Sequence, residues 1–267
     1  MLFCMNPLAE ENTVYMTSLD WPPYSGVELL EQGASVEIAT SALANVGLKL
    51  VVDFYPWSRA VRLAGAPTSK YIGYLPEYYA QSLDADFYFS NEIGRGPLGF
   101  VERTDAPVLW SELSDLKPYT IGVVRDYVNT RAFDALVERG ELTVQSVTSD
   151  VLNLRKVNAG RIDLAVIDKH VMHYWLERDD KLIQRKASLQ FNAKMLADKK
   201  LFVCFKRSEL GEKVRSLFNQ GLAMVDIEVI MQKHFGTGGR HGGNVGEGNS
   251  GPVLEQLYDI DPQEVLH

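Results

Sequence analysis

Short apolar runs alternate with helical patterns along most of the chain. Residues 14–19 and 48–54 predict two strands, and between them a helical pattern begins near Ala34 and ends at Gly47. The same alternation continues with strands at residues 119–124, 162–167 and 201–205, and with helices at residues 130–139, 151–157 and 210–225. This order of elements predicts βαβ units, a largely parallel sheet and an α/β fold.

The order of the elements also predicts two lobes. The late strand and helix have no partners of their own, so we expect them to return to the first lobe, which then comprises residues 12–102 plus 201–236. Residues 103–200 form the second lobe. Two crossing strands, near residues 98–103 and 201–207, link the lobes, and such a pair acts as a hinge in which a few residues absorb a closing motion.

The two ends of the chain differ in composition from the rest. Residues 1–11 are apolar up to Ala9 and then acidic, like the last part of a secretory signal without its basic region; a disordered start is the alternative. Residues 237–267 read as a Gly-rich tether and a C-terminal tail. We therefore expect a location outside the cytoplasm, with an incomplete signal sequence in this chain.

Composition excludes several classes of function. The chain has 267 residues, 46% hydrophobic content and a formal net charge of -8, which disfavours nucleic acid and anionic membrane surfaces as partners. No apolar run approaches the roughly 18 residues of a membrane span. Cys204 lies in an apolar run and predicts a buried small hydrophobe. With no metal or redox spacing of cysteines, we expect no cofactor and no metal.

Five segments together carry a family likeness. They are residues 20–25 (Asp-Trp-Pro-Pro-Tyr-Ser), 55–60 (Tyr-Pro-Trp-Ser-Arg-Ala), 89–90 (Phe-Ser), 121–124 (Ile-Gly-Val-Val) and 157–168 (Val-Asn-Ala-Gly-Arg-Ile-Asp-Leu-Ala-Val-Ile-Asp). In this order and spacing the chain resembles the family 3 bacterial extracellular solute-binding proteins, the receptors of polar amino-acid ABC transporters. The resemblance implies a type II periplasmic binding protein fold, with a ligand between two α/β lobes, and a monomer that works with a membrane permease.

The resemblance also implies a set of ligand-binding residues. Asp20, Trp21 and Tyr24 belong to the turn that walls the family's cleft, and Trp57 follows the second strand on the same wall. Asp168 matches the aspartate that takes the ligand's ammonium, a role suited to a carboxylate because a desolvated cation needs a charged, hydrogen-bonding partner. The alternatives are structural: a turn shaped by prolines, a core tryptophan and, for the aspartate, the N-cap of a helix.

One departure from the family pattern bears on the ligand. Amino-acid binders carry Thr-Pro-Glu-Arg, whose arginine forks onto the ligand's α-carboxylate, where residues 75–78 read Leu-Pro-Glu-Tyr. Either Arg59, Arg95 or Arg125 replaces that arginine, or the ligand is not an ordinary α-amino acid. The alternative is that these arginines are solvated surface residues that do not contact the ligand.

Aromatic side chains crowd the same segment, which we interpret as a loop. Tyr74 and Tyr78, flanked by Tyr71 and Tyr79, would suit a ring or a quaternary ammonium through stacking or cation–π contact. Residues 94–99 match Gly-x-Gly-x-x-Gly, but a proline and a strand-like run follow where a dinucleotide site needs a helix, so we reject that function.

Three hypotheses follow. The first is capture of a small polar or amino-acid-like solute for ABC-type uptake, without catalysis. The second is a ligand-sensing module of a signalling system. The third is a dehydratase-like enzyme on the same fold, for which Glu77 is the one general acid we nominate. We rank the enzyme last because the chain lacks length for an added catalytic domain.

Overall fold

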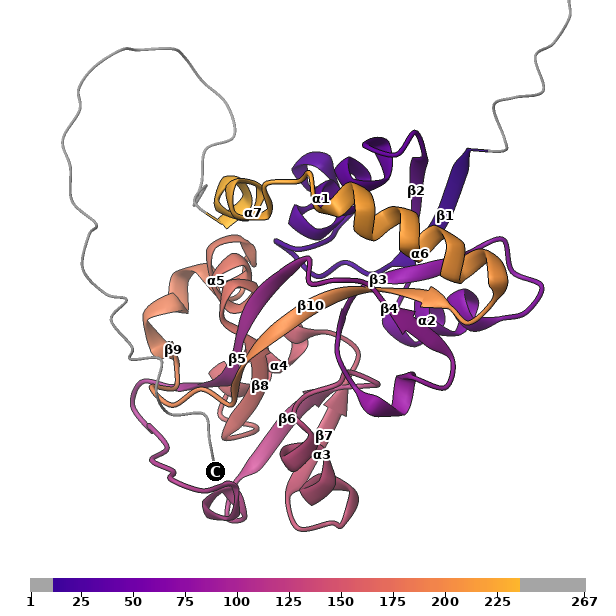
Figure 1. Cartoon of the computed structure of the whole chain (residues 1–267). Helices are drawn as coiled ribbons and strands as arrows, with labels where there is room; N and C mark the ends of the chain where they lie inside the picture. The colour runs from indigo at the N-terminus through magenta and orange to yellow at the C-terminus, as the bar shows by residue number, and fades with distance from the viewer. Residues whose placement is uncertain (1–11, 236–267) are drawn as a thin grey trace, which may run out of the picture.

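The computed structural model describes residues 12–235, which form two groups of helices and strands joined by two long strands (Figure 1). Residues 1–11 and 237–267, for which we expected a leader and a tether, lie outside the described residues. In chain order the elements are β1 (Thr13–Ser18), η2 (Leu30–Gln32), α1 (Ala34–Ala44), β2 (Lys49–Phe54), α2 (Trp57–Gly65), β3 (Gly73–Tyr78), η3 (Gln81–Leu83), β4 (Phe87–Phe89), β5 (Gly94–Arg103), η4 (Leu113–Leu116), β6 (Thr120–Val124), α3 (Arg131–Glu138), β7 (Thr143–Val147), α4 (Asp150–Asn158), β8 (Leu164–Asp168), α5 (Lys169–Arg178), η5 (Ile183–Ser188), β9 (Leu189–Phe191), β10 (Ala197–Lys206), α6 (Glu209–Leu222) and α7 (Ile227–Phe235).

One sheet runs through both lobes. Within residues 12–235 its strand order is β2-β1-β3-β10-β5-β8-β6-β7, with β4 paired to β10 and β9 paired to β5. β1 pairs parallel with β2 and β3, and β6 pairs parallel with β7 and β8. β5 and β10 are antiparallel to each other and to their outer neighbours. The sheet is therefore parallel inside each lobe, as the sequence predicts, and antiparallel where the lobes meet.

The first lobe consists of the sheet β2-β1-β3 with the adjoining end of β10 and its flanking helices. α1 and α6 pack against each other and α2 packs on β1 and β3 (Figure 1). The core is apolar and closely filled: Ile38, Leu43, Phe205 and Phe218 are fully buried. Burial of this surface supplies the main favourable free energy of folding, about 25 cal/mol for each Å² of apolar area.

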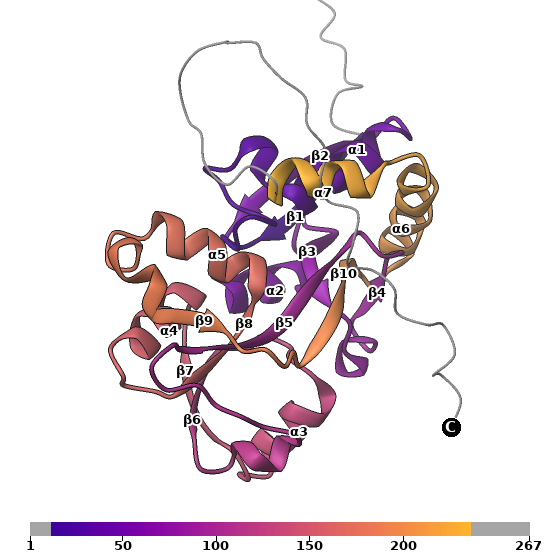
Figure 2. The ribbon, with the colours of Figure 1, turned by 90° about the vertical axis from the view of Figure 1, so that its left-hand side faces the viewer.

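The second lobe consists of β8, β6 and β7 with α3, α4 and α5. α4 and α5 pack together on the sheet, and the view turned by 90° shows them beside β8 and β9 (Figure 2). Leu154, Val157 and Leu164 are fully buried, as is Phe133 of α3, whose ring lies 6.1 Å from that of Phe100. Buried apolar residues of both lobes join through the hinge strands into one hydrophobic cluster.

Two features of the sheet differ from the prediction. The hinge strands begin about four residues earlier than expected, because β5 starts at Gly94 and β10 at Ala197. The aromatic segment interpreted as a loop is the strand β3, buried at every position from Gly73 to Tyr78. Pro76 suggested a loop because proline lacks a ladder donor, whereas the buried aromatic residues favour a strand.

Candidate ligand-binding cleft

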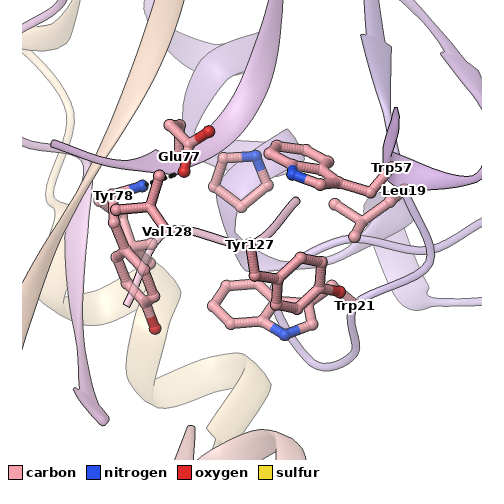
Figure 3. A pocket seen from close by; sticks show the side chains of 9 residues that line it. Leu19, Trp21, Trp57, Glu77, Tyr78, Tyr127 and Val128 are labelled. Atoms are coloured by element: carbon pink, nitrogen blue, oxygen red, sulfur yellow. Dashed lines mark hydrogen bonds between the residues drawn. The ribbon is translucent and has the colours of Figure 1, made fainter. Parts of the chain in front are cut away.

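A pocket lies where the carboxyl ends of the parallel strands of the two lobes face each other. β1, β2 and β3 supply its wall from the first lobe, the segment after β6 supplies residues from the second, and β10 contributes one hinge residue. In open α/β sheets ligands bind at this edge. Figure 3 shows the rings of Trp21, Trp57 and Tyr127 on one side of the space, and Glu77 with Tyr78 on the other. The pocket is lined by Leu19, Trp21, Trp57, Pro76, Glu77, Tyr78, Tyr127, Val128 and Leu201.

The pocket is small because the aromatic side chains fill the space between the lobes. Its cavity volume is about 30 Å³, and a single water molecule needs roughly 10–15 Å³. Pockets that hold drug-sized ligands measure roughly 300–1,000 Å³. The described arrangement is therefore a closed one, and a solute larger than a few atoms reaches the pocket only when the lobes separate.

Aromatic residues of the first lobe support one another along the pocket. Trp21 stacks on Tyr24 with ring centroids 4.5 Å apart and meets the edge of Tyr78 at 5.8 Å. Trp57 begins α2 and packs edge-on against Tyr74 at 5.4 Å. All five rings are buried. Large aromatic side chains in such contacts contribute to stability beyond the area they bury.

Asp168 joins the two lobes at the base of the cleft. It ends β8 and caps α5, because its Oδ1 accepts the backbone N–H of His170 at 2.7 Å and of Val171 at 3.2 Å. Its Oδ2 lies 3.1 Å from the hydroxyl of Tyr24 and 3.5 Å from that of Tyr78. The side chain is thus both the N-cap that we gave as an alternative and a partner of tyrosines from the first lobe.

Gly96 of the hinge strand makes this meeting possible. A Cβ atom at Gly96 would overlap the carboxylate of Asp168 and would lie 2.7 Å from the hydroxyl of Tyr24. That hydroxyl also lies 3.3 Å from the carbonyl oxygen of Arg95. The glycine is therefore required for close approach at the point where both walls contact the hinge.

Further contacts hold the two lobes together at the rim. The indole N–H of Trp57 donates to the backbone carbonyl of Asp126 at 3.0 Å, and the hydroxyl of Ser58 donates to the carboxylate of Asp126. Lys199 of β10 donates to the carbonyl of Asn129 at 2.6 Å. These hydrogen bonds connect α2 and the hinge to the segment after β6, so separating the lobes breaks them.

Helix α7 adds a contact at the outer side of the cleft. Phe235 stacks on His170 of α5 with ring centroids 4.4 Å apart and meets the edge of Tyr24 at 5.0 Å. The helix itself is anchored to the first lobe, where Lys233 pairs with Glu37 at 2.7 Å. Burial lowers the pKa of His170 to about 4, so this histidine is neutral near pH 7. α7 therefore reaches from the first lobe to the second.

Three carboxyl groups around the pocket are almost fully buried. Glu77, Asp150 and Asp168 are 6%, 5% and 1% exposed. Burial raises the pKa of Glu77 to about 8 and the pKa values of Asp150 and Asp168 to about 7. A buried carboxylate without a cationic partner is costly, and the group responds by holding its proton.

Six of the predicted site residues lie in or directly behind the pocket. Trp21, Trp57 and Tyr78 line it, and Tyr24 and Asp168 meet at its base. Tyr74 lies behind the wall, where its hydroxyl donates to Glu77 at 3.2 Å. Their contact with a ligand stays a prediction, but the structure brings them together.

The other four predicted residues lie outside the pocket. Asp20 is exposed and shapes its turn by accepting the N–H of Val27 at 3.0 Å. Arg59 covers the ring of Tyr55 at 4.8 Å, and Arg125 is exposed after β6. Arg95 is 52% exposed and pairs with Glu92 and Asp198. None of the three arginines lines the pocket, and the replacement of the carboxylate-binding arginine by one of them stays a prediction.

Several pocket residues were not predicted. Leu19, Val128 and Leu201 are apolar lining residues, and Tyr127 donates to Asp150 at 3.4 Å. The signal for Tyr127 and Asp150 is their position, because each follows closely on a parallel strand of the second lobe. Carboxyl ends of such strands gather at one edge of a sheet.

No protein-family model and no curated protein sequence matches this chain. Among solved structures, the chain is similar to a histidine kinase sensor domain with similarity to periplasmic binding proteins: TM-score 0.71, 19% identity, 84% of this chain and 96% of that chain. It is also similar to the substrate-binding protein of an amino acid ABC transporter (TM-score 0.67, 14% identity, 84% and 100%). A third similar structure is the BvgS VFT2 domain of Bordetella pertussis (TM-score 0.67, 18% identity, 85% and 94%).

These likenesses define the fold as that of the two-lobed periplasmic binding proteins, with two hinge strands, as the sequence predicts. The structural neighbours include solute-binding proteins of the kind that the sequence motifs resemble, and also a sensor domain. Among residues 12–235 no helix is long and apolar enough to cross a membrane, and no group of three or more His, Cys, Asp and Glu is placed to hold a metal ion.

Proposed function

We propose that this chain is an extracytoplasmic solute-binding protein that captures a small polar or amino-acid-like ligand between its lobes for ABC-type uptake. The observation that carries the proposal is the pocket, which both lobes line at the carboxyl ends of their parallel strands. The fold shared with a substrate-binding protein of an amino acid ABC transporter supports it. The protein acts as a monomer, delivers its ligand to a membrane permease and performs no chemistry.

Capture follows from the geometry of the hinge. Opening rotates the lobes about β5 and β10 and separates Tyr24 from Asp168. A polar ligand then takes over the hydrogen bonds of that pair, and closure buries it against the aromatic wall. The ligand stabilises the closed state by the difference between its binding free energies for the closed and the open states.

Calorimetric titration of the full chain with amino acids, amines and small peptides tests the proposal. We expect at least one class to bind with a Kd in the micromolar range or below, and X-ray scattering to show a more compact particle when that ligand is bound. Failure of every class of small polar solute to bind at millimolar concentration would overturn the proposal.

Sensing is the second candidate function. Its supporting observation is α7, whose last described residue, Phe235, touches Tyr24 in the first lobe and His170 in the second. A partner joined after this helix would respond to closure, and one of the similar structures is a histidine kinase sensor domain. Adjacent genes for a kinase or cyclase would favour sensing, whereas genes for a permease and an ATPase would favour uptake.

A further inference from the structure

The carboxyl groups of the cleft differ from the other buried carboxyl groups of the chain. Asp179 pairs with Arg155, and Glu102 accepts hydrogen bonds from the N–H of Val108 and from two side-chain amides. Glu77, Asp150 and Asp168, in contrast, have no ion-pair partner among residues 12–235. The other buried acids are paired or fully hydrogen-bonded within the protein. The three acids of the cleft are therefore the ones available to a cation from outside.

The side-chain partners of the three acids within the cleft are tyrosine hydroxyls. Asp150 accepts a long hydrogen bond from the hydroxyl of Tyr127, at 3.4 Å, besides its own backbone N–H. Glu77 accepts one from the hydroxyl of Tyr74 at 3.2 Å, besides the N–H of Tyr78. Asp168 faces the hydroxyls of Tyr24 and Tyr78. A neutral hydroxyl donates a weaker hydrogen bond than an ammonium does, so an ammonium group that enters would displace these hydroxyls.

The pocket wall is also built to face a cation. Aromatic faces attract positive charge, most strongly when both are desolvated. One cation already uses this wall, because the ammonium of Lys199 lies 4.9 Å from the ring centre of Tyr78. Trp21, Trp57 and Tyr127 offer further rings within the lining.

An anionic ligand group meets the opposite conditions. Arg59, Arg95 and Arg125 lie outside the pocket, and the position of the family's carboxylate-binding arginine is Tyr78. A carboxylate placed in the pocket would lie beside Glu77, with no guanidinium to pair with. The nearby ammonium of Lys199 already donates to the carbonyl of Asn129, and burying a carboxylate without a bidentate cationic partner is costly.

We propose that the ligand is a small organic cation without a carboxylate, an amine or a quaternary ammonium, held by the acids Asp168 and Asp150 against the aromatic wall. This inference rests on the proposed function and names its ligand class. Glu77 is a third acid, on the side of the first lobe, whose raised pKa of about 8 keeps it mostly protonated near pH 7.

The test compares ligands that differ in a carboxylate. The full chain is titrated calorimetrically with 1,4-diaminobutane and L-ornithine, and with choline and glycine betaine, because the second member of each pair carries the carboxylate that the first lacks. We expect one of the two cations to bind at least tenfold more tightly than its carboxylate-bearing counterpart. Equal or tighter binding of the counterpart in both pairs, or no binding of either cation, overturns the inference.

Two variants test whether the acids contact the cation. Asp168→Asn keeps an N-cap for α5, and Asp150→Asn keeps the size of its side chain. We expect each to weaken binding of the cation at least tenfold, while Asp180→Asn, an exposed acid of the same lobe, leaves it unchanged. Unchanged affinity in both cleft variants, each shown by circular dichroism to be folded, overturns the inference.

The pH dependence of affinity gives an independent reading. Asp168 is faced by Tyr24, Tyr78 and Asp150, and Asp150 is faced by Tyr127. A cation requires these carboxyl groups in the charged form, so it must displace their protons below pH 7. We expect affinity to rise about fivefold between pH 6 and pH 7 for each group, because a group of pKa about 7 goes from about one-tenth to one-half ionised over this range. Affinity independent of pH over this range contradicts the inference.

The outcomes separate this inference from the proposed function. If amino acids or neutral solutes bind and the carboxylate-free cations do not, the inference is wrong and the solute-binding function stands. If nothing binds from any class, both are wrong.

Discussion

The two walls of the cleft are built from different chemistry. The wall of the first lobe is mostly aromatic, with Trp21 edge-on to Tyr78 and Trp57 edge-on to Tyr74. The second lobe lines the pocket with Tyr127 and Val128 and brings the buried acids Asp150 and Asp168 to the hydroxyls of Tyr127 and Tyr78. Aromatic burial stabilises the fold, while unpaired buried carboxyl groups reduce its stability. The aromatic wall therefore stabilises the closed form. The buried acids lower its stability but supply negative charge that a ligand can use.

Removing a ring from the first wall gives the largest expected loss. Trp57 is 7% exposed and contacts Tyr74, Tyr127 and the carbonyl of Asp126. We expect Trp57→Ala to lower the free energy of unfolding by about 3–5 kcal/mol, measured by urea denaturation at pH 7. Trp57→Phe, which keeps a ring, is the control and should lose less. A loss below about 1 kcal/mol for the alanine variant would show that this wall does not stabilise the fold.

Neutralising an acid of the second wall is expected to increase the free energy of unfolding, by an amount that depends on pH. Burial raises the pKa of Asp150 from its ordinary value of 3.8 to about 7 in the folded protein. Below pH 4 both states are protonated; between pH 4 and 7 only the folded state holds the proton, so stability falls as pH rises.

Asp150→Asn removes this dependence. We expect the stability of the variant relative to the wild type to increase by about 2–3 kcal/mol between pH 5 and pH 7, since one pKa unit corresponds to about 1.4 kcal/mol. Urea denaturation at the two pH values measures it, with Asp180→Asn as the flat control. A difference that stays constant with pH contradicts a raised pKa for Asp150.

A methyl group at the hinge tests the point where the two walls meet. We expect Gly96→Ala to separate Tyr24 from Asp168 and to destabilise the protein by about 1–3 kcal/mol, because the Cβ atom overlaps both side chains. Gly65→Ala is the matched control: its Cβ atom would lie 3.3 Å from the ring of Phe87, at the end of a helix. Equal stability of the two variants would show that the walls tolerate separation at Gly96.

The smallest effect is expected outside both walls. Arg95 forms exposed ion pairs with Glu92 and Asp198, and such pairs contribute about 0.2–1 kcal/mol. We expect Arg95→Ala to change the free energy of unfolding by less than about 1 kcal/mol and to leave ligand affinity unchanged in calorimetric titration. A tenfold loss of affinity would instead place this arginine on the ligand.

The fold was predictable where the hydrophobic period and the residues that begin or end an element agree. Helix α6, with its 3.6-residue period, and strand β8, which is wholly apolar up to Asp168, both appear within a few residues of their predicted bounds. β3 was missed because Pro76 interrupts a buried aromatic strand. β7 was missed because Thr143–Val147 is a mostly exposed edge strand without an apolar pattern.

The site was predictable only where local motifs carry it. The Trp-Pro-Pro-Tyr turn placed Trp21 beside the cleft, and the segment after β2 placed Trp57 there. Asp150 was missed because β7, the strand that it follows, was itself not predicted. The three arginines were suggested by residue type alone. In the closed form they are exposed and lie outside the pocket.

The path of the chain through the sheet has a consequence for the order of folding. All strands of the second lobe outside the hinge lie between residues 104 and 196, whereas the first lobe needs β10, which inserts between β3 and β5 late in the sequence. Contacts between distant residues form slowly, and a chain made on the ribosome supplies its N-terminal part first. We expect the second lobe to complete its core while β1 and β3 still wait for β10, and pulsed hydrogen exchange during refolding would reveal this order.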